Sequence, residues 1–191
     1  MQSGKFIACR KFQVTLISAS DLEDVRKVFK MNVHARVSIN SQAEKRTEAD
    51  KHGGTSPKWS QSVEYTIGES AVIHHGLMLV IKLYCKRKLG DKYIGEVHTS
   101  IKELFDSSIK NGGNCSGEMT CPVLKGSNGV QGTLTFSYRF GDRINVKRPP
   151  KYKKLVESGA AVLLCLAIFV KTGVYLPIEE IPIFTDPEVI E

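Results

Sequence analysis

The chain has 191 residues, 41% hydrophobic and 25% charged, which excludes a disordered or fibrous protein and indicates an ordinary globular one. Most of its net charge of +7 lies in residues 1–142, which carry 20 Lys and Arg against 14 Asp and Glu. This excess of positive charge favours an anionic partner. The five cysteines are an odd number without a CxxC pair, so free thiols in a reducing compartment are expected, and the first residues lack the apolar core of a secretory signal.

Apolar and polar residues alternate through residues 12–140, which predicts a series of short strands separated by turns rich in Gly, Asn and Ser. We predict eight strands near 12–16, 33–39, 44–49, 63–67, 77–85, 93–99, 118–124 and 134–140, with one helical turn at 101–105. One buried and one wet face per strand is typical of an antiparallel sheet. Eight strands in this length predict an all-β sandwich.

The same alternation assigns individual side chains to the two faces. His34, Arg36 and Ser38 alternate with apolar residues and are predicted to face solvent. Cys85 falls on the core side of its strand, where a small buried hydrophobe is expected rather than a nucleophile. Trp59 follows Pro57 and is predicted to anchor the core.

Beyond residue 142 the pattern changes, so we divide the chain into a domain at 1–142 and three further segments. Residues 143–154 hold six basic residues and no acid and are predicted to be a linker. Residues 155–176 are predicted to form a hydrophobic helix and 177–191 an acidic tail. The uninterrupted apolar run, 159–170, is 12 residues long, whereas a bilayer needs about 20. A spanning anchor with its basic flank on the cytosolic side, an interfacial helix and a helix packed on the sandwich all remain open.

Several motifs together resemble a known domain. FQVTLISASDL resembles the opening strand of C2 domains, NVHARVSI their following strand, SPKWSQSVEYTI their NPxW turn, GDKYIGEV their D-D-x-I-G segment and GTLTFSYRFG their last strand. The resemblance covers roughly 12–141 and is closest to plant cold- and stress-regulated C2 proteins of the SRC type. It implies an eight-stranded antiparallel C2-type β-sandwich, in the permuted topology because only 11 residues precede Phe12. It also implies membrane targeting in stress or defence signalling.

Calcium-dependent C2 domains crowd carboxylates into their loops, and the resemblance lets us compare those positions here. The first metal position aligns with Asp24 or Asp21 and the next with Asn32, while the last falls on Lys92, with Asp91 beside it. Calcium needs six to eight oxygen ligands, several of them from carboxylates. The paired acids of the family's third loop fall among 84–87, where no acid occurs, and Lys92 replaces another. We predict a degenerate site (Asp24, Asn32, Asp91) and no bound cofactor; a calcium-triggered sensor that uses Asp21, Asp24, Asn32 and Asp91 is the alternative.

Cations replace the missing acids and indicate direct binding of anionic head groups. Lys86, Arg87, Lys88 and Lys92 are expected at one loop tip, where each charge near an anionic leaflet contributes about 1 kcal/mol. Lys45, Arg46, Lys51 and Lys58 are expected to form a second lipid-binding patch, since C2 relatives carry a basic patch on that side. The alternative is that these residues are solvated surface charges.

No arrangement of residues indicates catalysis, and the basic stretches lack the interleaved aromatics of nucleic-acid binders, so we predict neither an enzyme nor a nucleic-acid partner. The expected function is that of a membrane-associated adaptor that binds anionic phospholipid and an unidentified signalling protein. The expected location is the cytoplasmic face of a membrane, such as the plasma membrane. A protein-interaction scaffold that binds no lipid is a further alternative.

Overall fold

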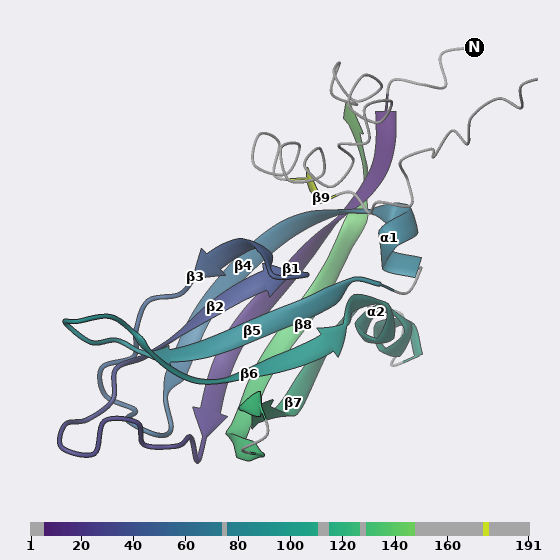
Figure 1. Cartoon of the computed structure of the whole chain (residues 1–191). Helices are drawn as coiled ribbons and strands as arrows, with labels where there is room; N and C mark the ends of the chain where they lie inside the picture. The colour runs from purple at the N-terminus through teal and green to yellow at the C-terminus, as the bar shows by residue number, and fades with distance from the viewer. Residues whose placement is uncertain (1–5, 74–75, 111–114, 127–128, 148–173, 176–191) are drawn as a thin grey trace, which may run out of the picture.

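The computed structural model describes residues 6–73, 76–110, 115–126, 129–147 and 174–175. Strands and two short helices make up this part of the chain (Figure 1). In order they are β1 (Phe6–Ser20), β2 (Val33–Ile39), β3 (Gln42–Arg46), β4 (Lys58–Gly68), α1 (Glu69–Ile73), β5 (Met78–Cys85), β6 (Lys92–Ser100), α2 (Ile101–Lys110), β7 (Ser116–Leu124) and β8 (Val130–Lys147), followed by the two-residue strand β9 (Val174–Tyr175).

The strands form a sandwich of two four-stranded layers. The strand order is β3-β2-β5-β6-β7-β8-β1-β4-β9, and β6 joins β7 through the residue pair Glu96 and Leu124. The sheet folds over at this junction, so that β3-β2-β5-β6 faces β7-β8-β1-β4 (Figure 1). The first strand lies between β8 and β4, both antiparallel to it. The predicted eight-stranded antiparallel sandwich of permuted topology is therefore confirmed.

The core lies between the two layers and is lined by the alternating side chains of both. Phe12, Val14 and Leu16 of β1 are fully buried, as alternation along a half-buried strand predicts. Two side chains of β4 reach across to β2: Trp59 Nε1 donates to the Val33 carbonyl at 3.2 Å, and the Tyr65 hydroxyl donates to the Val37 carbonyl at 2.6 Å. Trp59 is thus a core anchor, as predicted.

Several elements are longer than predicted, including β1 (predicted at 12–16) and β4 (predicted at 63–67). β8 continues to Lys147, five residues into the predicted linker, because it pairs with the start of β1 from Phe6 onward. The predicted helical turn at 101–105 is α2, twice as long, and α1 was not predicted. Both helices lie at one end of the sandwich, opposite the loops that connect β1 to β2 and β5 to β6 (Figure 1).

Most of the predicted C-terminal helix, 155–173 and 176, lies outside the described residues, as does the acidic tail. At Val174–Tyr175 the structure has a strand instead, β9, which pairs in parallel with Thr66 and Ile67 of β4. No helix in the described part of the chain is long and apolar enough to span a bilayer.

Candidate functional site

Two loops meet at the end of the sandwich away from the helices, and we call residues 21–32 and 86–91 together the tip. The Arg87 side chain donates a hydrogen bond to the Val25 carbonyl across the two loops. At the base of the tip, the Lys86 amide donates to the Asn32 carbonyl at 2.8 Å. The loops therefore form one surface, with a shallow hollow of about 410 Å³ between Arg26 and the segment 87–90.

The predicted cationic residues of the β5–β6 loop do lie at this tip. Lys86, Lys88 and the adjoining Lys92 are exposed, whereas Arg87 is half-buried by its contact with the other loop. The β1–β2 loop adds three cations that the sequence analysis did not assign to the site, Arg26, Lys27 and Lys30. The sequence feature that could have identified them is the one that identified Lys86 and Lys88, namely a cluster of cations in a segment without strand alternation.

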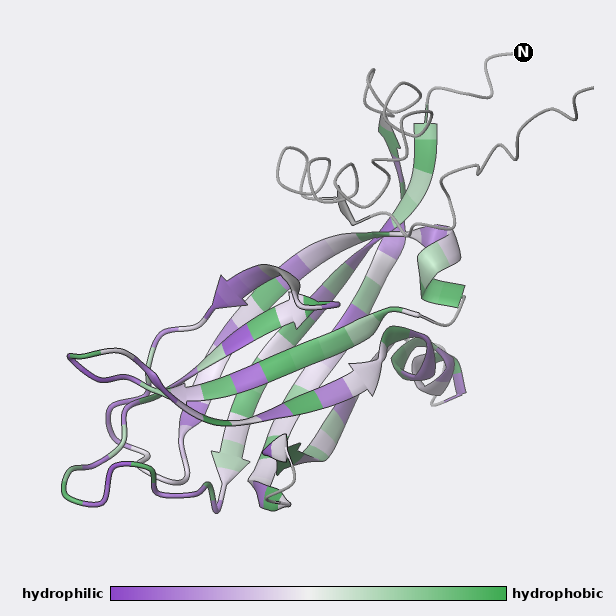
Figure 2. Ribbon diagram, in the orientation of Figure 1, coloured by the Kyte–Doolittle hydropathy of each residue, from purple (hydrophilic) through white to green (hydrophobic). Residues whose placement is uncertain are grey.

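Exposed apolar side chains stand among these cations. Val28 is 81% exposed, Phe29 68% and Leu89 103%, which makes them the three most exposed large hydrophobic side chains in the described part of the chain. Figure 2 shows hydrophobic positions in both loops, away from the apolar interior of the sandwich. The Arg26 guanidinium lies over the Phe29 ring, 5.2 Å from its centroid. The sequence analysis missed these three residues because a short apolar run in a loop has no periodicity to mark it.

Asp24, the predicted metal ligand of the first loop, caps a turn. Its Oδ1 accepts hydrogen bonds from the backbone amides of Arg26 and Lys27, at 2.9 and 3.2 Å. These bonds favour the ionised form and lower the pKa of Asp24. Asp21 is exposed and takes a left-handed backbone conformation, with φ of 56°. Asp24 therefore has the turn-forming role that short acidic side chains commonly have.

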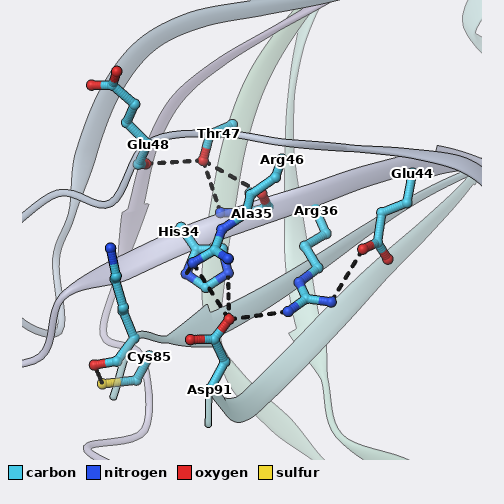
Figure 3. Close-up of polar contacts among 10 residues, drawn as sticks. His34, Ala35, Arg36, Glu44, Arg46, Thr47, Glu48, Cys85 and Asp91 are labelled. Carbon is cyan, nitrogen blue, oxygen red and sulfur yellow. Dashed lines mark hydrogen bonds and ion pairs between the residues drawn. The ribbon is translucent and has the colours of Figure 1, made fainter. Parts of the chain in front are cut away.

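Asp91, the predicted ligand of the other loop, lies against three nitrogen atoms of β2 and β3. Its Oδ2 is 3.0 Å from Arg36 Nη2, 3.3 Å from His34 Nε2 and 3.4 Å from Arg46 Nη2 (Figure 3). Burial alone would raise the pKa of Asp91, but the hydrogen bond from Arg36 and the nearby positive charges outweigh it and lower the pKa. The negative charge of Asp91 is thus compensated within the protein.

His34 does not face solvent, contrary to the prediction from alternation. It is fully buried on the outer side of β2, under Asp91 and Arg46 and beside the ring of Tyr84, 5.7 Å away. Ser38 is buried as well, so of the three residues predicted to be wet only Arg36 is partly exposed. A strand's outer face is wet only where nothing covers it, and here the base of the β5–β6 loop covers its start.

The neighbours of His34 determine its protonation. Arg46 Nη2 lies 3.5 Å from Nδ1, and because an arginine can only donate, this contact favours the tautomer with the hydrogen on Nε2. Burial, followed by the charge of Arg46, lowers the pKa of His34 to about 4. The neutral ring thus points a donor toward Asp91, but Nε2 lacks the alignment of a hydrogen bond and has no hydrogen-bond partner among the described residues.

The predicted metal residues are not gathered into a carboxylate cluster. Within the described residues, no three His, Cys, Asp or Glu side chains lie close enough to hold one ion. Asp24 is bound to backbone amides, Asp91 to arginines, and Asn32 contributes its carbonyl to the Lys86 amide.

The second predicted patch is partly engaged in internal contacts. Lys45 donates to the Glu64 carbonyl and lies over the Tyr65 ring, 4.8 Å from its centroid. Arg46 pairs with Asp91, although 46% of its side chain remains exposed. Lys58 is exposed at the start of β4, beside an open hollow of about 390 Å³ whose lining includes Lys51 and His52.

Comparison with known proteins agrees with this architecture. A family model described as the C2 domain matches residues 10–115. The Protein SRC2 homolog of Arabidopsis thaliana is 37% identical over 138 residues, covering 71% of this chain and 42% of that protein. Protein SRC2 of Glycine max is 35% identical over 141 residues, covering 71% and 47%. The chain therefore spans less than half the length of these curated relatives.

Solved structures agree on the fold. A C2 domain of plant Extended Synaptotagmin 1 has a TM-score of 0.57 at 14% identity, covering 69% of this chain and 94% of that one. A C2 domain-containing protein from a putative elicitor-responsive gene has a TM-score of 0.53 at 20% identity, covering 78% and 98%. With a family model matched over more than half of its residues and this topology, the chain belongs to the C2 domain family, where it is similar to the SRC2 proteins of plants.

Proposed function

We propose that this C2 domain binds anionic phospholipid membranes with its tip and needs no calcium to do so. The observation that carries the proposal is the combination at the tip of three exposed apolar side chains with a surround of cations. Val28, Phe29 and Leu89 are the apolar members. An exposed apolar cluster with a charged rim is typical of a surface that meets a membrane or a partner.

The two kinds of side chain have different roles in such binding. Cations attract the anionic leaflet over about a Debye length, near 8 Å at physiological salt, and each contributes about 1 kcal/mol. Apolar side chains gain about 1.5–3 kcal/mol each when they are fully buried, and less in the interface. Electrostatic attraction would therefore bring the domain to the surface, and the apolar residues would hold it there.

The contacts of the acidic residues support calcium independence. In a calcium sensor, empty carboxylates repel one another until the ion arrives. Here Asp24 accepts from two amides and Asp91 faces two guanidinium groups, so neither needs a cation. The surrounding lysines would in addition repel a dication.

The wider role that we propose is that of an adaptor at the cytoplasmic face of a membrane, in stress or defence signalling, with a signalling protein as its second partner. The similarity to SRC2 proteins supports this role. Lys58, which is exposed beside an open hollow, would add to the lipid contact if the domain lies on the side of the second patch.

Sedimentation with vesicles tests the proposal. The full chain is mixed with phosphatidylserine-containing or neutral vesicles, with calcium or with chelator, and compared with the triple variant Lys86→Ser, Lys88→Ser, Lys92→Ser. Arg87 is left in place because it holds Val25. The same substitutions are repeated in a chain that ends at Lys154, so that the hydrophobic segment does not mask the loss.

We expect the unmodified chain to bind anionic vesicles equally well with and without calcium, and the triple variant to lose most of this binding. A control that removes the same charge away from the tip, Lys11→Ser, Lys102→Ser, Lys110→Ser, should bind as the unmodified chain does. Binding that requires calcium would favour the sensor, and equal loss in both variants would show that only net charge matters.

A further inference from the structure

The Asp91 contacts have the form of an occupied anion site. Three nitrogen donors from β2 and the end of β3 converge on one oxygen atom, Asp91 Oδ2, at 3.0 to 3.4 Å. We define the three-donor site as His34, Arg36 and Arg46. Converging donors of this kind bind the oxygen atoms of carboxylates and phosphates.

The site is built before any external anion arrives. The Arg36 guanidinium is fixed by Glu44, 3.2 Å away, and by the Tyr84 ring, whose centroid is 4.4 Å away. His34 is fully buried and directs its Nε2 toward the site without a hydrogen-bond partner among the described residues. A buried donor without a partner is costly, so the site has bonding capacity that Asp91 does not satisfy.

Asp91 is also an incomplete counter-ion. A single carboxylate faces two guanidinium groups, and Glu44 offsets only part of the Arg36 charge from an exposed position. A phosphomonoester carries about −1.5 to −2 at pH 7 and has three acceptor oxygens. It would match the two arginines and the His34 Nε2–H better than a carboxylate does. The half-exposed Arg46 side chain provides access from solvent.

We propose that Asp91 is an internal anion that keeps the three-donor site closed, and that a phosphomonoester group competes with it and releases the base of the β5–β6 loop. Asp91 follows Gly90 at the end of this loop, so its contact with β2 and β3 ties the tip to the three-donor site. Since Asp91 is part of the same chain, its high effective concentration weakens the binding of any external anion. Occupation of the site would thus be coupled to the conformation of the tip.

The substitution Asp91→Asn tests the competition, because the amide keeps the shape and removes the charge. Inorganic phosphate is titrated against the full chain by calorimetry at constant ionic strength. We expect Asp91→Asn to bind phosphate about tenfold more tightly than the unmodified chain. Asp106→Asn on α2, which removes the same charge at the other end of the domain, should leave the affinity unchanged.

Addition of Arg46→Gln to Asp91→Asn should abolish the gain. Equal phosphate affinity of Asp91→Asn and the unmodified chain would overturn the proposal, and so would a gain that survives Arg46→Gln. If Asp91→Asn does not fold, amide exchange of the unmodified chain decides: saturating phosphate should speed exchange in residues 86–91, and unchanged exchange refutes the release.

A further experiment with vesicles distinguishes a lipid head group from a soluble phosphate as the source of the phosphomonoester, and this experiment rests on the proposed membrane function. Phosphatidic acid presents a phosphomonoester, whereas phosphatidylserine presents a diester, and the two are compared at equal surface charge. A larger gain of Asp91→Asn on phosphatidic acid supports a lipid ligand, and a gain with inorganic phosphate alone supports a soluble one. If the tip variants lose vesicle binding as expected but Asp91→Asn shows no gain on phosphate or on either lipid, the membrane function stands and the internal competition falls.

Discussion

At the scale of single residues, His34 should make the stability of the domain depend on pH. Its folded pKa is lowered to about 4, below the unfolded value near 6.5, so the unfolded chain takes up the proton first as the pH falls. The contribution of His34 is complete above pH 6.5 and is lost progressively down to about pH 4. The slope approaches about 1.4 kcal/mol per pH unit.

Urea unfolding at pH 7.5, 6, 5 and 4.5 measures this slope. We expect His34→Gln to be less stable at pH 7.5 but to have a flatter profile between pH 6.5 and 4. His98→Gln, whose side chain is 46% exposed on β6, should keep the slope of the unmodified chain. An unchanged slope in His34→Gln would assign the acid sensitivity elsewhere. Below pH 4 the lowered pKa values of Asp91 and Asp50 add a further loss as these carboxylates are protonated.

The exposed apolar residues of the tip should affect binding without affecting folding. Phe29→Ser with Leu89→Ser should weaken binding to anionic vesicles severalfold and change the free energy of unfolding by less than about 0.5 kcal/mol, because both side chains are exposed. Ile73→Ser with Ile109→Ser removes two half-exposed apolar side chains at the helical end and serves as the control. Equal vesicle affinity of the tip variant and the control would remove the apolar residues from the binding surface.

At the scale of elements, the junction of the two layers depends on Gly95. A Cβ at this position would lie 2.7 Å from Val123 Cγ1 and 2.8 Å from the Leu124 carbonyl oxygen, both on β7. Gly95 adjoins the residue pair that joins β6 to β7, so Gly95→Ala would push the layers apart where they meet. We expect a loss of about 1–3 kcal/mol in the free energy of unfolding.

Chemical denaturation measures this loss, with Gly141→Ala as the matched control. At Gly141 the nearest atom to a new Cβ would be Lys11 Cβ at 3.1 Å, in an edge region that can adjust. If Gly95→Ala is as stable as Gly141→Ala, the junction is more compliant than its contacts indicate.

The strands could be predicted because their alternation was set by a core on one side only. β2, β5 and β6 lie close to their expected ranges for this reason. Alternation predicted the wrong environment for His34, because it does not reveal that a loop more than 50 residues further along the chain covers the outer face of β2. The extension of β8 to Lys147 likewise depends on a partner strand more than 130 residues away, at Phe6.

The sequence predicted several of the charged residues that form the candidate site but not which residues they contact. The loop cations were evident from the sequence, and their positions at one tip agree with it. That Arg87 holds Val25, and that Asp91 faces Arg36 and Arg46, depends on how loops distant in sequence meet. Resemblance to a family predicts which position in the fold a residue occupies, but it does not predict which side chains that residue contacts in this protein.

At the scale of the whole molecule, calcium should have no effect on membrane binding or stability. We expect calorimetric titration of the full chain with calcium to show no binding at micromolar concentration, and Asp24→Asn to sediment with anionic vesicles as the unmodified chain does. Raising the salt from 50 to 500 mM should instead release the chain that ends at Lys154 from these vesicles, since exposed charges are screened. Micromolar calcium binding that Asp24→Asn abolishes would establish the sensor.

The direction in which the chain leaves the sandwich limits how the domain could be oriented on a membrane that also holds its C-terminal segment. β1 runs toward the tip and β8 runs back beside it, so Lys147 pairs with Phe6 at the end away from the tip. The 15 residues of β1 span about 45 Å at ~3.3 Å per residue. The eight steps from Lys147 to Leu155 reach at most about 28 Å. If residues 155–176 insert into a bilayer, β9 must leave β4. An upright domain then cannot place its tip on that same bilayer, so it would have to lie on its side there or bridge two opposing membranes.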